Sequence, residues 1–162
     1  MTFFTIELLI RLITSAVGSC AFALVFKTHK RHLLMVSISG LITYFIYYTV
    51  SFFGGGYFVS SFAATFFAAL FGELCARTFH APTLLYLVTG LIPIVPGGEA
   101  YYTMKYLLER NTPMANEKLL ATGGVALGIA GGIVLVSLMF GVLSDRLAKK
   151  QKQKTEEGHG KH

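Results

Sequence analysis

Residues 82–110 read PTLLYLVTGLIPIVPGGEAYYTMKYLLER. A continuous helix of this length would measure about 43 Å, whereas the hydrocarbon core of a bilayer is about 30 Å thick. Pro93 and Pro96 have no backbone N–H group to donate within a helix, and Gly97 and Gly98 leave the backbone after them flexible. Pro93 would lie about 16 Å from the start of the segment, close to the middle of a membrane. We therefore expect a membrane helix that is broken at the Pro-x-x-Pro-Gly-Gly sequence.

A break at this depth also predicts a binding site. Unwound backbone inside a membrane is tolerated only where protein buries it or where it lines a watery cavity. A second half-helix that begins near Gly98 would direct free N–H groups and the positive end of its dipole into such a cavity. Broken helices in transporters hold anionic substrate groups in this way. The alternative is a proline kink that only shapes packing, and two prolines followed by Gly-Gly and an acid favour the site.

The whole chain has the composition of a protein embedded in a bilayer. Of its 162 residues, 54% are hydrophobic and 14% are charged, and the mean hydropathy is +0.61. These values disfavour a water-soluble fold, and the length allows about five spans of about 20 residues. We predict an all-α membrane protein with one transmembrane domain, residues 1–144. Its spans are expected at about 6–26, 33–53, 57–79, 82–110 (the broken one) and 119–144.

The Lys and Arg residues predict the orientation. Ten of them lie on one side of this arrangement and three on the other; the ten are in 27–32, at Arg77 and from Arg146 onward, and the three are Lys105, Arg110 and Lys118. The positive-inside bias places the ten-charge side in the cytoplasm, so the N-terminus is expected outside and the C-terminus inside. The polar tail, 145–162, is predicted to be disordered and to contact anionic lipid.

Two of the expected helices carry small residues four positions apart. One set is Ser60, Ala64, Ala68, Gly72 and Ala76, and the other is Gly124, Gly128 and Gly132. Such faces let another helix approach closely. When two halves with an odd number of spans follow one another in a chain, they have opposite orientations in the membrane. Inverted-repeat transporters have this arrangement. We therefore expect the small-residue faces to meet a related five-span subunit or, failing that, a second copy of the chain.

Two pairs of opposite charges occur at i,i+4 spacing in apolar segments: Glu7 with Arg11, and Glu73 with Arg77. Ions inside a membrane are unfavourable, and each pair can neutralise itself. Snorkelling at a span end is the favoured interpretation of Glu7 and Arg11. Glu73 and Arg77 are instead candidate substrate-binding or coupling residues.

Signatures of other function classes are absent from the sequence. There is no HExxH, GxSxG or Walker loop, and the single Asp is Asp145. We therefore expect neither an enzyme nor a cofactor, and the lack of ATP machinery indicates secondary transport. Cys20 and Cys75 lie in apolar segments without metal-ligand spacing, which argues against a zinc site or a disulfide. The net charge of +6 is explained by topology rather than by nucleic-acid binding.

The segment GLIPIVPGGEAYYTM, residues 90–104, resembles the signature of the threonine/serine exporter family, whose C-terminal membrane half has a similar Pro-x-x-Pro-Gly sequence followed by Tyr and Thr. RTFHAP, residues 77–82, is similar to the family's Arg before a Pro that opens the next span. The likeness runs from residues 21–26 to the last span and leaves out the tail. The chain looks like the small C-terminal-half subunit of the split form of the exporter, which is associated with export of succinate or related dicarboxylates across a bacterial plasma membrane.

The resemblance also implies a site and a partner. The positions that match are Arg77, Pro82, Pro93, Pro96, Gly97, Tyr102 and Thr103. With Gly98, Glu99 and Glu73, all of these except Pro82 form our candidate set for substrate binding or coupling. The large partner would resemble the N-terminal half of the exporter, and the substrate would be threonine, serine or a dicarboxylate. The alternative is an accessory or assembly subunit without its own substrate site.

Glu99 departs from the family pattern, in which an uncharged residue is usual at this position. An acid there would repel a carboxylate substrate unless the acid is protonated or bound to a cation. Glu99 is therefore the candidate for proton coupling. The other interpretation is that its carboxylate caps the half-helix, where a negative charge is favourable.

Overall fold

The computed structural model is a bundle of helices. It describes the backbone of residues 2–159 and the side chains of residues 6–143. In chain order the elements are α1 (Thr2–Val25), α2 (Lys30–Phe52), α3 (Tyr57–Phe79), α4 (Thr83–Leu91), the 3₁₀ turn η1 (Ile92–Ile94), α5 (Gly97–Leu108) and α6 (Thr112–His159). Within the described part, four helices are long and apolar enough to cross a membrane, and the bent pair Thr83–Ile94 and Gly97–Leu108 would make a fifth span. The predicted all-α membrane fold is confirmed.

Short turns hold consecutive helices side by side. Gly54, with φ of 86°, supplies the left-handed residue between α2 and α3. α3 ends at His80, whose φ is 53°, and the Ala81 N–H donates to the Ala76 carbonyl across this end. Arg110, with φ of 55°, lies in the turn between α5 and α6. The Asn111 side chain then accepts a hydrogen bond from the Met114 N–H at 3.4 Å, which caps the start of α6.

The most extensive helix contact in the bundle joins α3 and α6, which run parallel. Gly124 lies against Tyr57, and Gly128 lies against Phe58 and Ser61 one turn further along both helices. A Cβ added to Gly128 would lie 2.6 Å from the carbonyl oxygen of Phe58, nearer than real Cβ atoms come. Glycine is therefore required at this position for the two backbones to approach, as at other small-residue membrane interfaces.

This packing corrects the expectation that the small-residue faces meet a partner subunit. Ala64 and Ala68 of α3 are 0% and 1% exposed, and they pack in one core with Leu87 of α4 and Val136 of α6. Both small-residue faces are thus covered inside the chain. The physical reason is that small residues admit any helix that can approach, and helices of the same chain are always near. A partner must use other surfaces.

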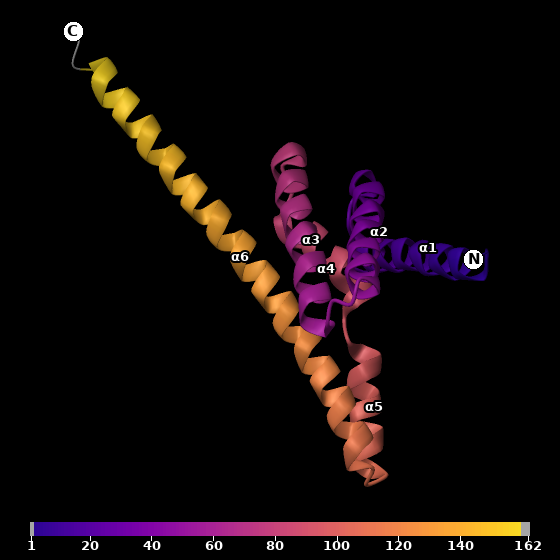
Figure 1. The fold of residues 1–162 in the computed structure, drawn as a ribbon. Helices are drawn as coiled ribbons and strands as arrows, with labels where there is room; N and C mark the ends of the chain where they lie inside the picture. The colour runs from indigo at the N-terminus through magenta and orange to yellow at the C-terminus, as the bar shows by residue number, and fades with distance from the viewer. Residues whose placement is uncertain (1, 160–162) are drawn as a thin grey trace.

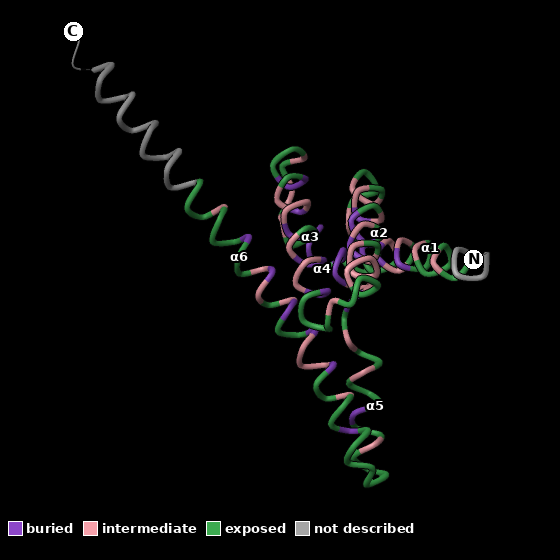
Figure 2. The backbone as a smooth tube through the Cα atoms, viewed as in Figure 1, coloured by how far each residue is buried: buried purple, intermediate pink, exposed green. Residues whose placement is uncertain are grey.

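Figure 1 shows the α5–α6 hairpin extending beyond the ends of α2 and α3, while α1 crosses the bundle steeply with its N-terminal end pointing away. Buried residues gather where α2, α3, α4 and the middle of α6 meet (Figure 2), and exposed residues dominate α5. The hairpin and α1 are therefore the parts of the chain with the least protein around them.

The C-terminal tail differs from the sequence expectation. Residues 145–159, predicted to be disordered, have a helical backbone that continues α6. Lys, Arg, Gln and Glu are good helix formers, and an existing helix extends through them without a new nucleation cost. Residues 160–162 and the tail side chains lie outside the described residues, and with them the expected lipid contact.

Candidate substrate site at the helix break

The helix break is formed at Pro96 rather than at Pro93. Ile92, before Pro93, keeps helical angles (φ −46°, ψ −43°), and the chain passes through η1. Val95, before Pro96, is extended (φ −61°, ψ 125°), the conformation that a following proline favours. The helix restarts at Gly97, and the two halves meet at 47°. The α-helix thus ends at Leu91, the 3₁₀ turn carries the helical path on to Ile94, and the second proline of the motif ends it.

A cavity of about 210 Å³ opens beside the break. Its walls come from the break itself and from α2, α3 and α6: Pro93, Ile94, Val95, Pro96, Gly98, Glu99, Tyr47, Tyr57 and Val125. The volume corresponds to about seven water molecules and is below the range of about 300–1,000 Å³ that drug-sized ligands need. Among the described residues, no three His, Cys, Asp or Glu side chains gather to hold a metal ion. The cavity is therefore sized for a molecule smaller than a drug-sized ligand.

Glu99, which lines this cavity, forms an ion pair with a lysine of the next helix. Lys118 Nζ on α6 lies 2.9 Å from Glu99 Oε2 on α5, and that oxygen is shielded from solvent. The side chains of Glu99 and Lys118 are 37% and 26% exposed. The pair is thus partly open to the cavity and partly covered, a place where another charged group can compete for either member.

The structure excludes one of the ways in which Glu99 could cap α5. Glu99 is the third residue of α5, the position from which a Glu side chain usually reaches back to the N–H of the N-cap residue. The N-cap of α5 is Pro96, which has no N–H group, and the structure shows no side-chain hydrogen bond at this cap. A capping box cannot form, so the carboxylate acts on α5 only through the helix dipole. Its direct partner is Lys118.

Most of the predicted residues near the break come together. Pro93, Pro96, Gly98 and Glu99 line the cavity, and Gly97 begins α5 between them. Thr103 lies one turn further along, where it is buried and donates its hydroxyl to the Glu99 carbonyl at 2.8 Å. It supports the backbone of the site rather than lining it.

Tyr102 lies outside the cavity. Its ring stacks on Tyr106 at 6.2 Å between centroids and contacts the edge of Tyr101 at 5.5 Å. Tyr102 is 45% exposed and Tyr101 is 66% exposed. These rings form an outward-facing aromatic row on α5.

Glu73 and Arg77 lie apart from the break. Arg77 Nε is 3.6 Å from Glu73 Oε2, and its guanidinium lies over the Phe140 ring at 4.8 Å. Arg77 is twenty residues along α3 from Tyr57, which is about 30 Å along a helix. Glu73 also accepts a hydrogen bond from the Thr83 hydroxyl, at 3.3 Å. This pair joins the C-terminal part of α3 to the start of α4 and to the middle of α6, and neither residue lines the cavity.

Sequence reasoning missed Lys118, Tyr47 and Tyr57 as site residues. One signal for Lys118 was present: Glu99 and Lys118 stand roughly two to three turns before and after the short link between α5 and α6. An antiparallel hairpin brings such positions together. Nothing in the local sequence distinguishes Tyr47 or Tyr57 from the other tyrosines, because their place depends on tertiary packing.

The comparison with known families gives one match. A family model described as "Threonine/Serine exporter, ThrE" matches residues 11–139. This range covers well over half of the chain, from within α1 to within α6, and includes the entire break. No curated protein and no solved structure matches the chain.

Proposed function

Because the chain belongs to the threonine/serine exporter family, we propose that it is a half-subunit of a secondary transporter that exports small carboxylate-bearing metabolites, either threonine and serine or dicarboxylates such as succinate. The observation that carries this proposal is the cavity at the helix break, where the start of α5 meets the Glu99–Lys118 ion pair. A helix N-terminus beside a lysine suits a carboxylate. Tyr47 and Tyr57, which also line the cavity, carry phenol groups that can donate to the same ligand.

The two substrate classes require different charge chemistry at this ion pair. A threonine or serine zwitterion can exchange with it, because the substrate ammonium replaces Lys118 beside Glu99 and the substrate carboxylate replaces Glu99 beside Lys118. A dicarboxylate satisfies Lys118 but leaves Glu99 beside a like charge. Dicarboxylate export therefore needs a proton or a cation at Glu99, whereas amino-acid export does not.

Glu99→Gln tests this assignment. For a dicarboxylate, the substitution should retain binding and weaken the dependence of export on a pH gradient, because the proton-carrying group is lost. For an amino acid, it should weaken binding, because the ammonium loses its partner. A small change in stability with unchanged flux and pH dependence would mean that Glu99 acts only on the dipole of α5.

We further propose that the chain works in a bacterial plasma membrane with a five-span partner that resembles the N-terminal half of the exporter, or as a homo-oligomer. The N-terminus would be outside and the C-terminus cytoplasmic, as the distribution of Lys and Arg favours. Lys30→Cys should then resist a membrane-impermeant thiol reagent in intact cells, while Thr112→Cys should react. The reverse pattern would overturn the orientation.

Proteoliposomes test the function directly. Vesicles that contain the chain, alone or with the co-expressed partner, are loaded with threonine, serine, succinate and other amino and dicarboxylic acids. We expect saturable export of at least one of these compounds, and its loss when the cavity is blocked by Gly98→Phe. If no combination transports any of them and the chain only raises the yield of the partner, it is an accessory subunit without its own site.

A further inference from the structure

A second cavity lies against the same break, on the side of α1. It has a volume of about 240 Å³ and is lined by Arg11, Thr14, Ser15 and Gly18 of α1, by Tyr44 of α2, and by Ile92 and Pro93 of the break. Pro93 also lines the first cavity, so the two cavities share a residue of the break. An ionisable residue in an apolar helix that faces such a cavity is a candidate for function.

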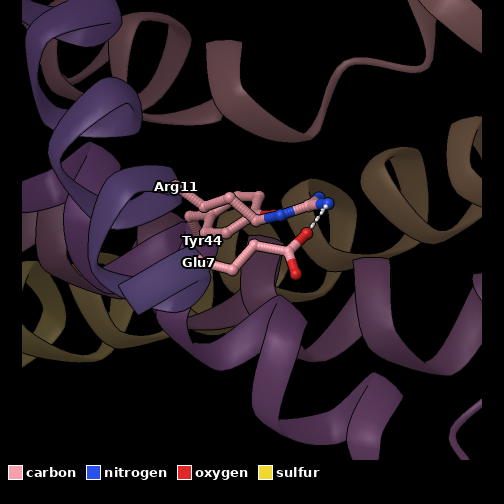
Figure 3. Close-up of polar contacts among 3 residues, drawn as sticks. All are labelled: Glu7, Arg11 and Tyr44. Carbon is pink, nitrogen blue, oxygen red and sulfur yellow. Dashed lines mark hydrogen bonds and ion pairs between the residues drawn. The ribbon is translucent and has the colours of Figure 1, made fainter. Parts of the chain in front are cut away.

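Arg11 has the surroundings of an anion-binding residue whose present partner is a carboxylate of the same chain, Glu7. Arg11 Nη2 donates to Glu7 Oε1 at 2.7 Å (Figure 3). Arg11 Nη1 donates to the Tyr44 hydroxyl oxygen at 3.4 Å. A guanidinium has five N–H donors in a planar fork that matches a carboxylate. Tyr44 accepts from Arg11, which leaves its own O–H able to donate. Arg11 and Tyr44 can thus bind a second carboxylate, or one that displaces Glu7.

The remaining polar groups of the cavity are acceptors. The Thr14 hydroxyl donates to the carbonyls of Ile10 and Arg11, and the Ser15 hydroxyl donates to the Leu12 carbonyl. Their oxygens therefore offer only lone pairs to a ligand. They cannot add to the binding of an anion, so recognition of a carboxylate in this cavity depends on Arg11 and Tyr44.

We propose that this second cavity binds the carboxylate group of a small metabolite, with Arg11 as its cationic partner and Glu7 as the internal carboxylate that holds Arg11 when the cavity is empty. The ligand class rests on the proposed export function, but binding can be measured without transport. The Glu73–Arg77 pair provides a matched comparison, because it has the same i,i+4 spacing, is an ion pair in the structure, and does not line either cavity at the break.

Cysteine protection tests the proposal on the full chain in vesicles of a zwitterionic lipid. In a background with Cys20 and Cys75 replaced by Ala, Gly18→Cys places a thiol at the cavity, where an added Cβ meets nothing within 4 Å. Gly141→Cys, equally uncrowded and on α6, is the control. With L-threonine or succinate at about ten times its dissociation constant, labelling of Gly18→Cys should slow about tenfold, because the site is mostly occupied. Labelling of Gly141→Cys should not change.

Three comparisons decide the outcome. Arg11→Gln should abolish protection and Arg77→Gln should retain it. Glu7→Gln should tighten binding by up to about fivefold, the range expected when an exposed competing ion pair is removed. Threoninol, which lacks the carboxylate, should not protect.

Protection by threoninol, or protection that survives Arg11→Gln, would overturn the proposal. If Arg11→Gln does not fold, Glu7→Gln and threoninol decide alone. Protection without export in the same vesicles would support the site and refute the transport function. Export without protection would support the transport function and refute the site.

Discussion

Replacement of Gly128 by alanine should weaken the bundle, because this position sets the distance between α3 and α6. The new Cβ would lie 2.6 Å from the Phe58 carbonyl oxygen, 2.9 Å from the Ser61 Cβ and 3.0 Å from the Phe62 nitrogen. Two of these three atoms are backbone, so the helices must move apart. Overpacking of this kind costs about 1–3 kcal/mol. The change from glycine to alanine also gains about 1 kcal/mol of helix propensity.

Gly123→Ala isolates the packing cost. Gly123 lies in the same helix and gains the same propensity, but a Cβ there meets nothing within 4 Å. The two variants should therefore differ by about 1–3 kcal/mol in the free energy of unfolding, or about 5- to 150-fold in the unfolding equilibrium. Titration of purified protein from mild detergent into SDS, followed by far-UV circular dichroism, measures this difference. If Gly128→Ala is as stable as Gly123→Ala, the close parallel packing of α3 on α6 is wrong.

Three further predictions follow from the break, the ion pair and the core. Pro96→Ala should let Val95 become helical and should reduce export, whereas Pro93→Ala should leave the break in place. The ¹³Cα chemical shift of Val95 measures its backbone conformation. An unchanged shift in Pro96→Ala would contradict our account of the break. Glu99→Lys and Lys118→Glu should each lower the thermal midpoint, and the double reversal should restore it; without restoration the ion pair does not hold the hairpin. Tyr86→Phe removes a 2.7 Å hydrogen bond between a fully buried phenol and the His32 ring. It should lower the free energy of unfolding, measured by SDS titration, by about 0.5–1.5 kcal/mol. An unchanged free energy of unfolding would place the phenol in solvent.

The sequence predicted the helices well because their signals are local. Apolar runs of sufficient length set α1, α2 and α3 within a few residues of their observed bounds. The break was also predictable, because a proline restricts its own backbone and that of the residue before it. Which of the two prolines ends the helix was not predicted. That depends on whether the residue before each proline can stay helical in its packed surroundings, as Ile92 does and Val95 does not.

The site was predictable only in part. Glu99 and the prolines follow one another in the chain, so local reasoning brought them together. Arg77 was assigned by resemblance to a motif, yet its distance along α3 keeps it from the cavity. Arg11 comes from a helix far away in the sequence, and only the packing of α1 against the break brings it there. Lys118 lies on the helix that follows α5, and the antiparallel hairpin of α5 and α6 places it beside Glu99. The small-residue faces were recognised correctly as close-packing surfaces, but sequence periodicity does not say which helix will cover them.

The two cavities share one electrostatic design that bears on transport. An exporter must return empty to the side where it loads substrate, and an unpaired ion in an apolar environment would oppose that step. Each cavity has one member of an ion pair in its wall and the pair's other member beside it in the same chain: Arg11 with Glu7 at 2.7 Å, and Glu99 with Lys118 at 2.9 Å. If both cavities bind carboxylates, each substrate carboxylate replaces an internal one, and neither the loaded nor the empty state leaves a cation unpaired. Because Pro93 lines both cavities, a movement of the 92–96 segment changes both at once. Neutralising both internal carboxylates together, by Glu7→Gln with Glu99→Gln, should therefore slow the return of the empty carrier more than exchange of substrate for substrate, and equal effects on the two rates would refute this design.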